Sequence, residues 1–272
     1  MDNPEIGKSI NVAGIKTNYI DMGEGAPVLM IHGSGPGVTG WANWRLNAPV
    51  LAQSLRLIIP DMVGFGYTEP SPTGQYNPDL WVNHAIALLD ALGIERAHIV
   101  GNSFGGALAL ALASRHPERI NRMVLMGSAG LKFNLTWALD KVWGYQPSIE
   151  AMKELLEIFA YDRSKVSDDL AELRYRASVR PGIAEQFSDM FPAPRQRWLD
   201  ALALDEQVIR SIMHDALIIH GREDIVVPVD NAYRLHALLP NSQLHVFGRC
   251  GHWTQIERCA TFNSLVSNYL AE

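Results

Sequence analysis

The segment 101–106, which reads Gly-Asn-Ser-Phe-Gly-Gly, holds the residue of this chain most able to do chemistry. It contains the pattern G-x-S-x-G between a strand-like apolar run at 97–100 and a helix-like run of alanine and leucine at 107–113. In a strand-to-helix turn this pattern exposes a nucleophilic serine, here Ser103. The flanking glycines permit the tight turn, and the start of the helix favours negative charge. The alternative is a glycine-rich turn with an idle serine.

Two later segments could supply the groups that a serine nucleophile needs. A serine hydroxyl is a weak nucleophile until a base removes its proton, and a further group must orient the base. In turns of this kind the partners follow along the chain in the order serine, acid, histidine. Asp224 follows one strand-like run, and His252 lies in a glycine-flanked loop after the next. We therefore expect a catalytic triad of Ser103, Asp224 and His252, with Glu223 as the adjacent competitor for the acid.

Two backbone N–H groups are candidates for an oxyanion hole. Attack on a carbonyl carbon places negative charge on its oxygen, which preorganised N–H groups stabilise. One donor is expected to be the N–H of Phe104, directly after the nucleophile. The second is expected in the glycine-rich loop 31–37 after an early strand, and we choose Ser34.

The same early loop supports a rival interpretation. Residues 35–40 match G-x-G-x-x-G after a strand, and Asp61 lies roughly 20 residues further on, where a ribose-binding acid would sit. This would make the protein a dinucleotide-binding oxidoreductase. Pro36 argues against it, because proline removes one amide from the phosphate cradle, and the interpretation leaves the triad unexplained. A third class, a hydrolase-like protein that binds a ligand without turning it over, stays open.

Composition limits the class of protein and its partners. The chain has 272 residues and a net charge of −6, which argues against a nucleic-acid partner because phosphate binding needs a basic face. The two cysteines, Cys250 and Cys259, form no disulfide framework, and the histidines show no metal-ligand pattern. No apolar run approaches the length of a membrane span, and no export signal is visible. We expect a cytoplasmic enzyme for a small molecule, without metal or cofactor, and leave a homo-oligomer open.

The order of the apolar runs predicts an α/β fold. Runs that are apolar on both faces suit buried parallel strands, and helical segments between them indicate a mostly parallel, doubly wound sheet. The opening residues, 9–22, read as an edge hairpin. Between 130 and 215 helical stretches replace strands, so we expect a core of 1–129 and 216–272, with a helical lid at 130–215 inserted before the last two strands. The other expected strands are 28–31, 55–59, 98–100, 123–126, 217–219 and 244–247.

With these features together, the chain resembles the α/β-hydrolase family. The finer pattern is similar to the branch that hydrolyses carbon–carbon bonds in meta-ring-fission products of aromatic degradation, above all to 2-hydroxymuconate semialdehyde hydrolases and alkyl-substituted dienoate hydrolases. The resemblance spans nearly the whole chain. It departs from lipases, which often carry HGGG where this chain has His-Gly-Ser-Gly. The segments that carry it are 32–37, 41–44, 61–66, 101–106, 176–182 and 250–253.

The resemblance implies a reaction. The family's substrates are 2-hydroxy-6-oxo-hexa-2,4-dienoates, with a carboxylate at one end and an electrophilic carbonyl at the other. It implies that the substrate is first ketonised, with His252 moving the proton. Ser103, or a water that it positions, then adds to the 6-carbonyl, and collapse gives 2-hydroxypenta-2,4-dienoate and a carboxylic acid. A carboxylesterase of the same fold is the alternative.

The resemblance also implies substrate-binding residues. Arg180 matches the arginine that grips the carboxylate, Asn43 and Asn102 match positions that hydrogen-bond the polar end, and Trp253 matches a residue that packs on the diene. The far part of the pocket should be apolar, with a small residue leaving room for an alkyl group, although large apolar residues of a lid can also belong to the core. The candidates for this lining are Ala129, Trp143, Phe191, Leu199 and Val227.

Overall fold

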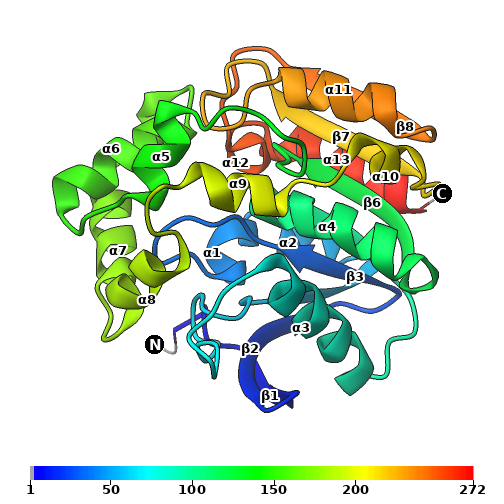
Figure 1. Ribbon diagram of the computed structural model, residues 1–272, viewed down its shortest axis with the longest axis horizontal. Helices are drawn as coiled ribbons and strands as arrows, with labels where there is room; N and C mark the ends of the chain where they lie inside the picture. The colour runs from blue at the N-terminus through cyan, green and yellow to red at the C-terminus, as the bar shows by residue number, and fades with distance from the viewer. Residues whose placement is uncertain (1–2, 272) are drawn as a thin grey trace.

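Eight strands form one sheet in the order β1-β2-β4-β3-β5-β6-β7-β8 in the computed structural model, which describes residues 3–271 (Figure 1). Residues 1–2 and 272, which the predicted core includes, lie outside the described part. Strands β3 to β8 run parallel, and the β1–β2 hairpin adds antiparallel strands beside β4. The predicted mostly parallel, doubly wound sheet is confirmed. The strands are β1 (Lys8–Val12), β2 (Ile15–Met22), β3 (Ala26–Ile31), β4 (Leu55–Pro60), β5 (Ala97–Asn102), β6 (Ile120–Met126), β7 (Ala216–Gly221) and β8 (Ser242–Phe247).

Helices cover both faces of the sheet, because successive residues of a strand point to opposite faces. In β3, Leu29 and Ile31 join one hydrophobic core, whereas Val28 and Met30 join the other. All four are fully buried, as expected for a central parallel strand. One face carries α3 (Pro78–Ala91), α4 (Phe104–Arg115) and α11 (Asp230–Leu238); the other carries α1 (Gly40–Trp44), α2 (Ala48–Leu51), α12 (Thr254–Glu257) and α13 (Cys259–Ala271).

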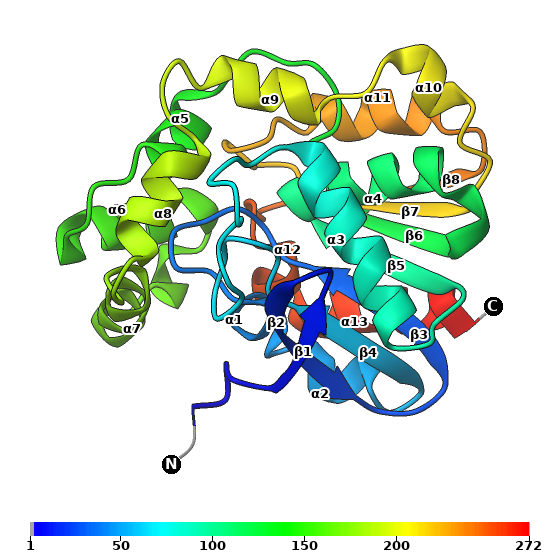
Figure 2. The same cartoon turned by 60° about the horizontal axis from the view of Figure 1, so that its bottom comes forward.

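Helices α5 to α10 lie between β6 and β7 along the chain, where the helical insertion is predicted. In Figures 1 and 2, α5 to α8 gather beside the core and α9 returns over it. Both α9 and α10 contact the core helix α4. The boundaries at 130 and 215, and the motion of this segment as a lid, stay predictions. The helices are α5 (Trp137–Trp143), α6 (Ile149–Phe159), α7 (Asp168–Ser178), α8 (Ile183–Met190), α9 (Gln196–Leu202) and α10 (Glu206–Arg210).

Loops at the carboxyl edge of the sheet position the candidate site. Strand β5 ends directly before Ser103, β7 ends shortly before Asp224, and β8 ends shortly before His252. Parallel strands present their carboxyl ends at one edge, which is where ligands bind in open α/β sheets. Side chains of α5, α6 and α7 border the pocket at this edge.

Candidate active site

Ser103 occupies a sharp turn between β5 and α4. Its backbone φ is 55°, in the left-handed region, and strained backbone of this kind clusters at functional sites. A Cβ on Gly101 would lie 2.3 Å from the carbonyl oxygen of Gly105, and a Cβ on Gly105 would lie 2.4 Å from that of Ile31. The two glycines of the pattern are therefore required by the close packing of backbone on either side of the serine.

His252 and Asp224 form a buried, hydrogen-bonded pair. His252 Nδ1 lies 2.7 Å from Asp224 Oδ2, and both side chains are buried. Because a carboxylate can only accept, Nδ1 carries the hydrogen and Nε2 is left to take a proton. Asp224 Oδ1 accepts hydrogen bonds from the backbone N–H groups of Val226 and Val227, at 2.8 and 3.0 Å. The carboxylate is therefore held in one orientation.

His220 is a second histidine on Asp224. Its Nε2 lies 3.2 Å from Asp224 Oδ2 and 2.9 Å from the carbonyl oxygen of Val227. Burial alone would raise the pKa of Asp224, but His252 and His220 outweigh burial and hold this pKa well below its usual range. Asp224 is therefore an anion wherever the fold is intact near neutral pH.

Glu223, the competing acid, is directed elsewhere. Its carboxylate accepts a hydrogen bond from the backbone N–H of Cys250 at 3.0 Å and pairs with Arg222 at 2.8 Å. Asp224 is thus the acid that contacts His252.

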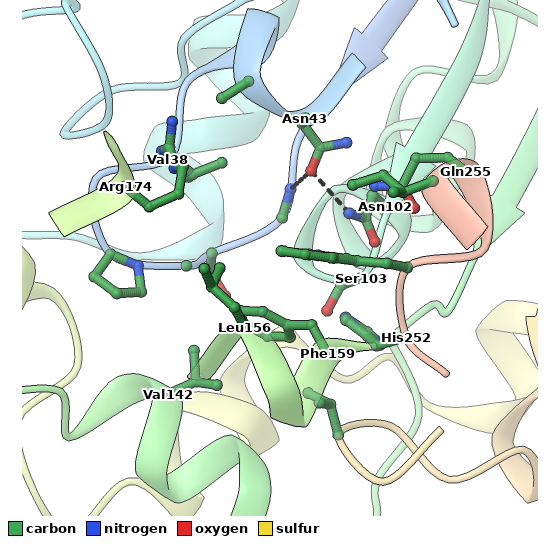
Figure 3. A pocket seen from close by; sticks show the side chains of 18 of the residues that line it. Val38, Asn43, Asn102, Ser103, Val142, Leu156, Phe159, Arg174, His252 and Gln255 are labelled. Carbon is green, nitrogen blue, oxygen red and sulfur yellow. Dashed lines mark hydrogen bonds between the residues drawn. The ribbon is translucent and has the colours of Figure 1, made fainter. Parts of the chain in front are cut away.

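Ser103 and His252 both line one pocket at the carboxyl edge of the sheet. Figure 3 shows the Ser103 hydroxyl pointing toward the His252 ring. Phe159 stacks on that ring with 5.9 Å between ring centres, and a Cβ on Gly127 would lie 3.1 Å from His252 Nδ1. The structure thus brings the three predicted triad residues together at the pocket and confines the imidazole between its neighbours.

The two predicted oxyanion donors belong to the start of α4 and to the loop after β3. Phe104 is the first residue of α4, so its N–H has no acceptor within the helix. Ser34 lines the pocket, and its hydroxyl accepts a hydrogen bond from Trp143 Nε1 at 3.0 Å. Their joint action on one oxygen stays a prediction.

Two of the three glycines in the G-x-G-x-x-G segment, Gly37 and Gly40, are required by close packing, which does not favour a dinucleotide site. A Cβ on Gly37 would lie 2.6 Å from the backbone nitrogen of Ser178 in α7. The segment leads into α1, a helix of five residues, which is short for a phosphate-binding helix terminus. Asp61 is buried, and its carboxylate accepts hydrogen bonds from the N–H groups of Gly40 and Tyr67. Asp61 is therefore engaged in holding loops together.

The polar side of the pocket contains Asn43 and Asn102, as predicted, and also Gln255, which the sequence analysis missed. Asn43 Oδ1 accepts from Asn102 Nδ2 at 2.8 Å and from the backbone N–H of Gly33 at 3.3 Å (Figure 3). Among the described residues no partner is found for Asn43 Nδ2, Asn102 Oδ1 or either end of the Gln255 amide. Buried polar groups without partners are costly, so this side of the pocket suits a polar ligand.

The structure corrects the prediction for Arg180. Its guanidinium lies 3.8 Å from the centre of the Tyr67 ring and donates to the carbonyl oxygen of Gly66 at 2.9 Å, outside the pocket lining. Arg174 lines the pocket instead. The reason is local: Arg174 lies on the buried face of α7, whereas Arg180 follows the end of that helix.

The apolar lining also differs from the prediction, although Trp253 lines the pocket as expected. Trp143 and Phe191 stack face to face, 4.6 Å between ring centres, and fill space behind the lining. The N–H of Ala129 donates to the carbonyl oxygen of Ser103 at 3.1 Å. The residues that the structure does not bring to the lining, because they pack in the core, are Ala129, Trp143, Phe191, Leu199 and Val227; the apolar lining includes Leu139, Val142, Met152, Leu156, Phe159 and Val226.

Within residues 3–271, no cluster of three or more side chains that could hold a metal ion is found. In the same part of the chain, none of the helices has the length and apolar character needed to span a membrane.

Known proteins share this architecture. The profile of the alpha/beta hydrolase fold family matches residues 26–258. A 2-hydroxymuconate semialdehyde hydrolase from Pseudomonas sp. (strain CF600) is 60% identical over 272 residues, covering 100% of this chain and 96% of that protein. A 2-hydroxy-6-oxo-2,4-heptadienoate hydrolase from Pseudomonas putida strain F1 is 56% identical over 269 residues, covering 99% and 98%. The S103A mutant of a meta-cleavage product hydrolase from Pseudomonas fluorescens IP01, solved in complex with acetates, is 59% identical with a TM-score of 0.98, covering 99% of both chains.

The sheet, the serine turn and the buried Asp–His pair are those of the α/β hydrolase fold family, to which this chain belongs. The similarity extends over nearly the full length of both relatives. Within the family, the chain therefore belongs to the hydrolases of meta-cleavage products, which confirms the resemblance drawn from its motifs.

Proposed function

We propose that this chain hydrolyses a carbon–carbon bond in 2-hydroxymuconate semialdehyde or its 6-alkyl analogues, giving 2-hydroxypenta-2,4-dienoate and a carboxylic acid. Two relatives named as hydrolases of such compounds support the reaction class. The observation that carries the proposal is one pocket in which Ser103 and His252 share the lining with two arginines, amide groups without partners and an apolar surface. These substrates match that pocket, because they combine a carboxylate, oxygen substituents and a hydrocarbon end.

The first step assigned to the site is a proton transfer. Cleavage of a carbon–carbon bond requires the leaving fragment to accept an electron pair, and the 2-keto form of the substrate can do so. His252 can move the proton in this ketonisation, since its Nδ1 is bonded to Asp224 and its Nε2 is left for the substrate. An imidazole is suited to such transfers near neutral pH.

The second step is addition to the 6-carbonyl. The Ser103 hydroxyl, or a water that it positions, attacks this carbon while His252 takes the proton. The oxygen that gains charge would be stabilised by the N–H groups of Phe104 and Ser34. Collapse breaks the bond between carbons 5 and 6, and the electron pair passes into the dienolate, which takes up a proton. With water as the net reactant, carbon 6 leaves as a carboxylic acid.

Arg174 is the group that we assign to the substrate carboxylate. It replaces Arg180 in this role because it lines the pocket, and a guanidinium can hold a carboxylate through two N–H groups. Asn43, Asn102 and Gln255 offer donors and acceptors to the oxygen on carbon 2.

The 6-substituent is assigned to the apolar side. Leu139, Val142 and Val226 lie there, and Figure 3 shows Val142 and Arg174 on different sides of the pocket. Such a surface discriminates one methylene by only about 1–3 kcal/mol. We therefore expect several 6-alkyl substrates to be accepted.

The test is the loss of visible absorbance from a panel of ring-fission products that differ only at carbon 6. The wild-type protein should consume them, and Ser103→Ala should reduce the rate by several orders of magnitude, as loss of a triad member does elsewhere. Nitrophenyl acetate added to the panel tests the alternative, a carboxylesterase. Turnover of the ester without turnover of any dienoate, or a near wild-type rate for Ser103→Ala, would overturn the proposal.

Cytoplasmic location and assembly remain predictions for this chain. Fractionation of the producing cells tests the first, and light scattering behind a sizing column tests whether the chain forms a homo-oligomer.

A further inference from the structure

The carboxylate side of the pocket contains more charge than a single arginine. Arg45 lines the pocket together with Arg174, and we call these two residues the arginine pair. Arg45 is the residue that follows α1, and Arg174 lies in α7, so the core and the inserted helices each contribute one cation. Two neighbouring cations, one half-buried and one buried, repel each other, and the structure supplies an anion beside them.

That anion is Glu5, in the segment before β1. Glu5 Oε1 accepts a hydrogen bond from Arg174 Nη1 at 3.0 Å, and the two side chains are only 14% and 10% exposed. A second N–H of Arg174, on Nη2, donates to the carbonyl oxygen of Gly37. These two bonds fix one edge of the guanidinium, and its remaining N–H groups are available for a ligand.

The segment that carries Glu5 is itself anchored. The carbonyl oxygen of Glu5 accepts a hydrogen bond from Asn18 Nδ2 at 2.9 Å, and Asn18 Oδ1 accepts one from the N–H of Gly7 at 2.9 Å. Asn18 lies in β2. The carboxylate of Glu5 is therefore held at the arginine pair by the sheet, and its position does not depend on a free chain end.

Glu5 compensates only part of the positive charge of the arginine pair. Burial lowers the pKa of Arg45 and of Arg174, and Glu5 acts in the opposite direction on both. Arg180 adds positive potential at Arg174. With Glu5 present, the arginine pair and Glu5 carry the charge of one cation, which matches one substrate carboxylate.

We propose that Glu5 is a specificity-determining residue of the carboxylate subsite: by pairing with Arg174 it orients the guanidinium and reduces the arginine pair to the charge of a single cation. This inference rests on the proposed function, in which Arg174 binds the substrate carboxylate. It assigns a role in substrate selection to a residue outside the catalytic loops. Without Glu5, the subsite would hold two uncompensated cations and would bind carboxylates more tightly.

The test measures binding and does not depend on turnover. Sorbate, a hexa-2,4-dienoate, is titrated calorimetrically into the wild-type protein, with methyl sorbate as the uncharged comparison. Glu5→Gln keeps an oxygen that can accept from Arg174 but removes the charge. We expect it to bind sorbate about tenfold more tightly, equal to about 1.4 kcal/mol, and to bind methyl sorbate as the wild type does. Glu5→Asp, which keeps the charge, should restore the wild-type difference between the two ligands.

Glu24→Gln is the matched control, because Glu24 is exposed in the turn before β3, at the end of that strand opposite to the site. Sorbate affinity that is unchanged or weaker in Glu5→Gln, or that rises equally in Glu24→Gln, would overturn the inference. If Glu5→Gln is too unstable to titrate, the rise in melting temperature caused by sorbate in Glu5→Asp and the wild type is compared instead, and a loss of that rise in Glu5→Asp counts against the inference. Arg174→Ala separates a failure of the inference about Glu5 from a failure of the proposed function: if this variant binds sorbate as the wild type does, the assigned carboxylate subsite is itself wrong.

Discussion

Replacing Asp224 with asparagine should nearly abolish turnover while leaving the fold in place. Asp224 Oδ1 is fixed by the backbone N–H groups of Val226 and Val227, so the carbonyl oxygen of asparagine would take that place. Its NH₂ group would then face His252 Nδ1, 2.7 Å away in the wild type. Since both groups cannot donate, Nδ1 must accept, and the ring hydrogen moves to Nε2. That is the nitrogen needed to take the proton from Ser103.

The size of the effect follows from the inverted tautomer. The same substitution in the serine-protease triad lowers kcat by about 10⁴-fold, which corresponds to about 5.4 kcal/mol in the activation free energy. We expect a loss of this order here, because the asparagine orientation is dictated by two backbone donors. Asp224 does not line the pocket, so the loss should appear in kcat, with little change in KM.

Stopped-flow absorbance with a 6-methyl ring-fission product measures both parameters, and a thermal melt verifies the fold. Glu223→Gln is the control, since it removes the neighbouring carboxylate charge while keeping an acceptor for the N–H of Cys250. A loss below tenfold for Asp224→Asn, with a normal melt, would refute the assignment of Asp224 as the residue that orients His252.

Three other substitutions test separate parts of the structure. Arg180→Ala should lower the free energy of unfolding by about 1 kcal/mol through loss of the Tyr67 and Gly66 contacts, with no change in sorbate affinity. A clear loss of affinity would show that Arg180 takes part in carboxylate binding. Val142→Ala should shift kcat/KM about tenfold toward larger 6-substituents, and an unchanged ratio would remove Val142 from the substrate surface. Burial lowers the pKa of His32 to about 4, below its unfolded value, so the unfolded chain binds the extra proton between about pH 4 and 6.5. The free energy of unfolding should therefore fall as the pH falls through this window, by about 1.4 kcal/mol per pH unit from this group. Urea unfolding at several pH values should show that the free energy of unfolding of His32→Gln depends less steeply on pH, by that amount. The same pH dependence in the variant and the wild type would contradict the neutral buried state of His32.

The strands were predictable because central parallel strands are apolar on both faces, and their runs end in glycine or in residues of the site. Long amphipathic helices such as α6 (Ile149–Phe159) were also predictable, since Met152, Leu155 and Leu156 repeat at helical spacing. The short helices α1, α2 and α12, of four or five residues, span too little chain to show a period.

The candidate triad could be found from sequence because each member follows a strand end in a recognisable local pattern. The choice between Asp224 and Glu223 required the structure, because the sequence does not determine which of two adjacent side chains in a loop faces His252. The arginine was misassigned for a related reason. The stretch from Arg174 to Arg180 offers three arginines, and only the burial of the face of α7 that contains Arg174 separates them. Arg174 lies at helical spacing from Ala171 and Ser178, the other buried residues of α7, and this spacing would have favoured Arg174.

The apolar lining was misassigned because neighbouring residues on a helix or turn point in different directions. Val142 lines the pocket, whereas Trp143 turns its indole toward Ser34 and Phe191. The Trp143 ring packs behind the wall, face to face with Phe191, and leaves the lining to the smaller side chain of Val142. A change at Phe191 should therefore alter the pocket indirectly, through the position of Trp143, of Val142 and of the hydroxyl of Ser34. The preference for the 6-substituent and the geometry of the predicted oxyanion hole are then coupled through one tryptophan, because its ring supports the apolar wall and its N–H holds Ser34.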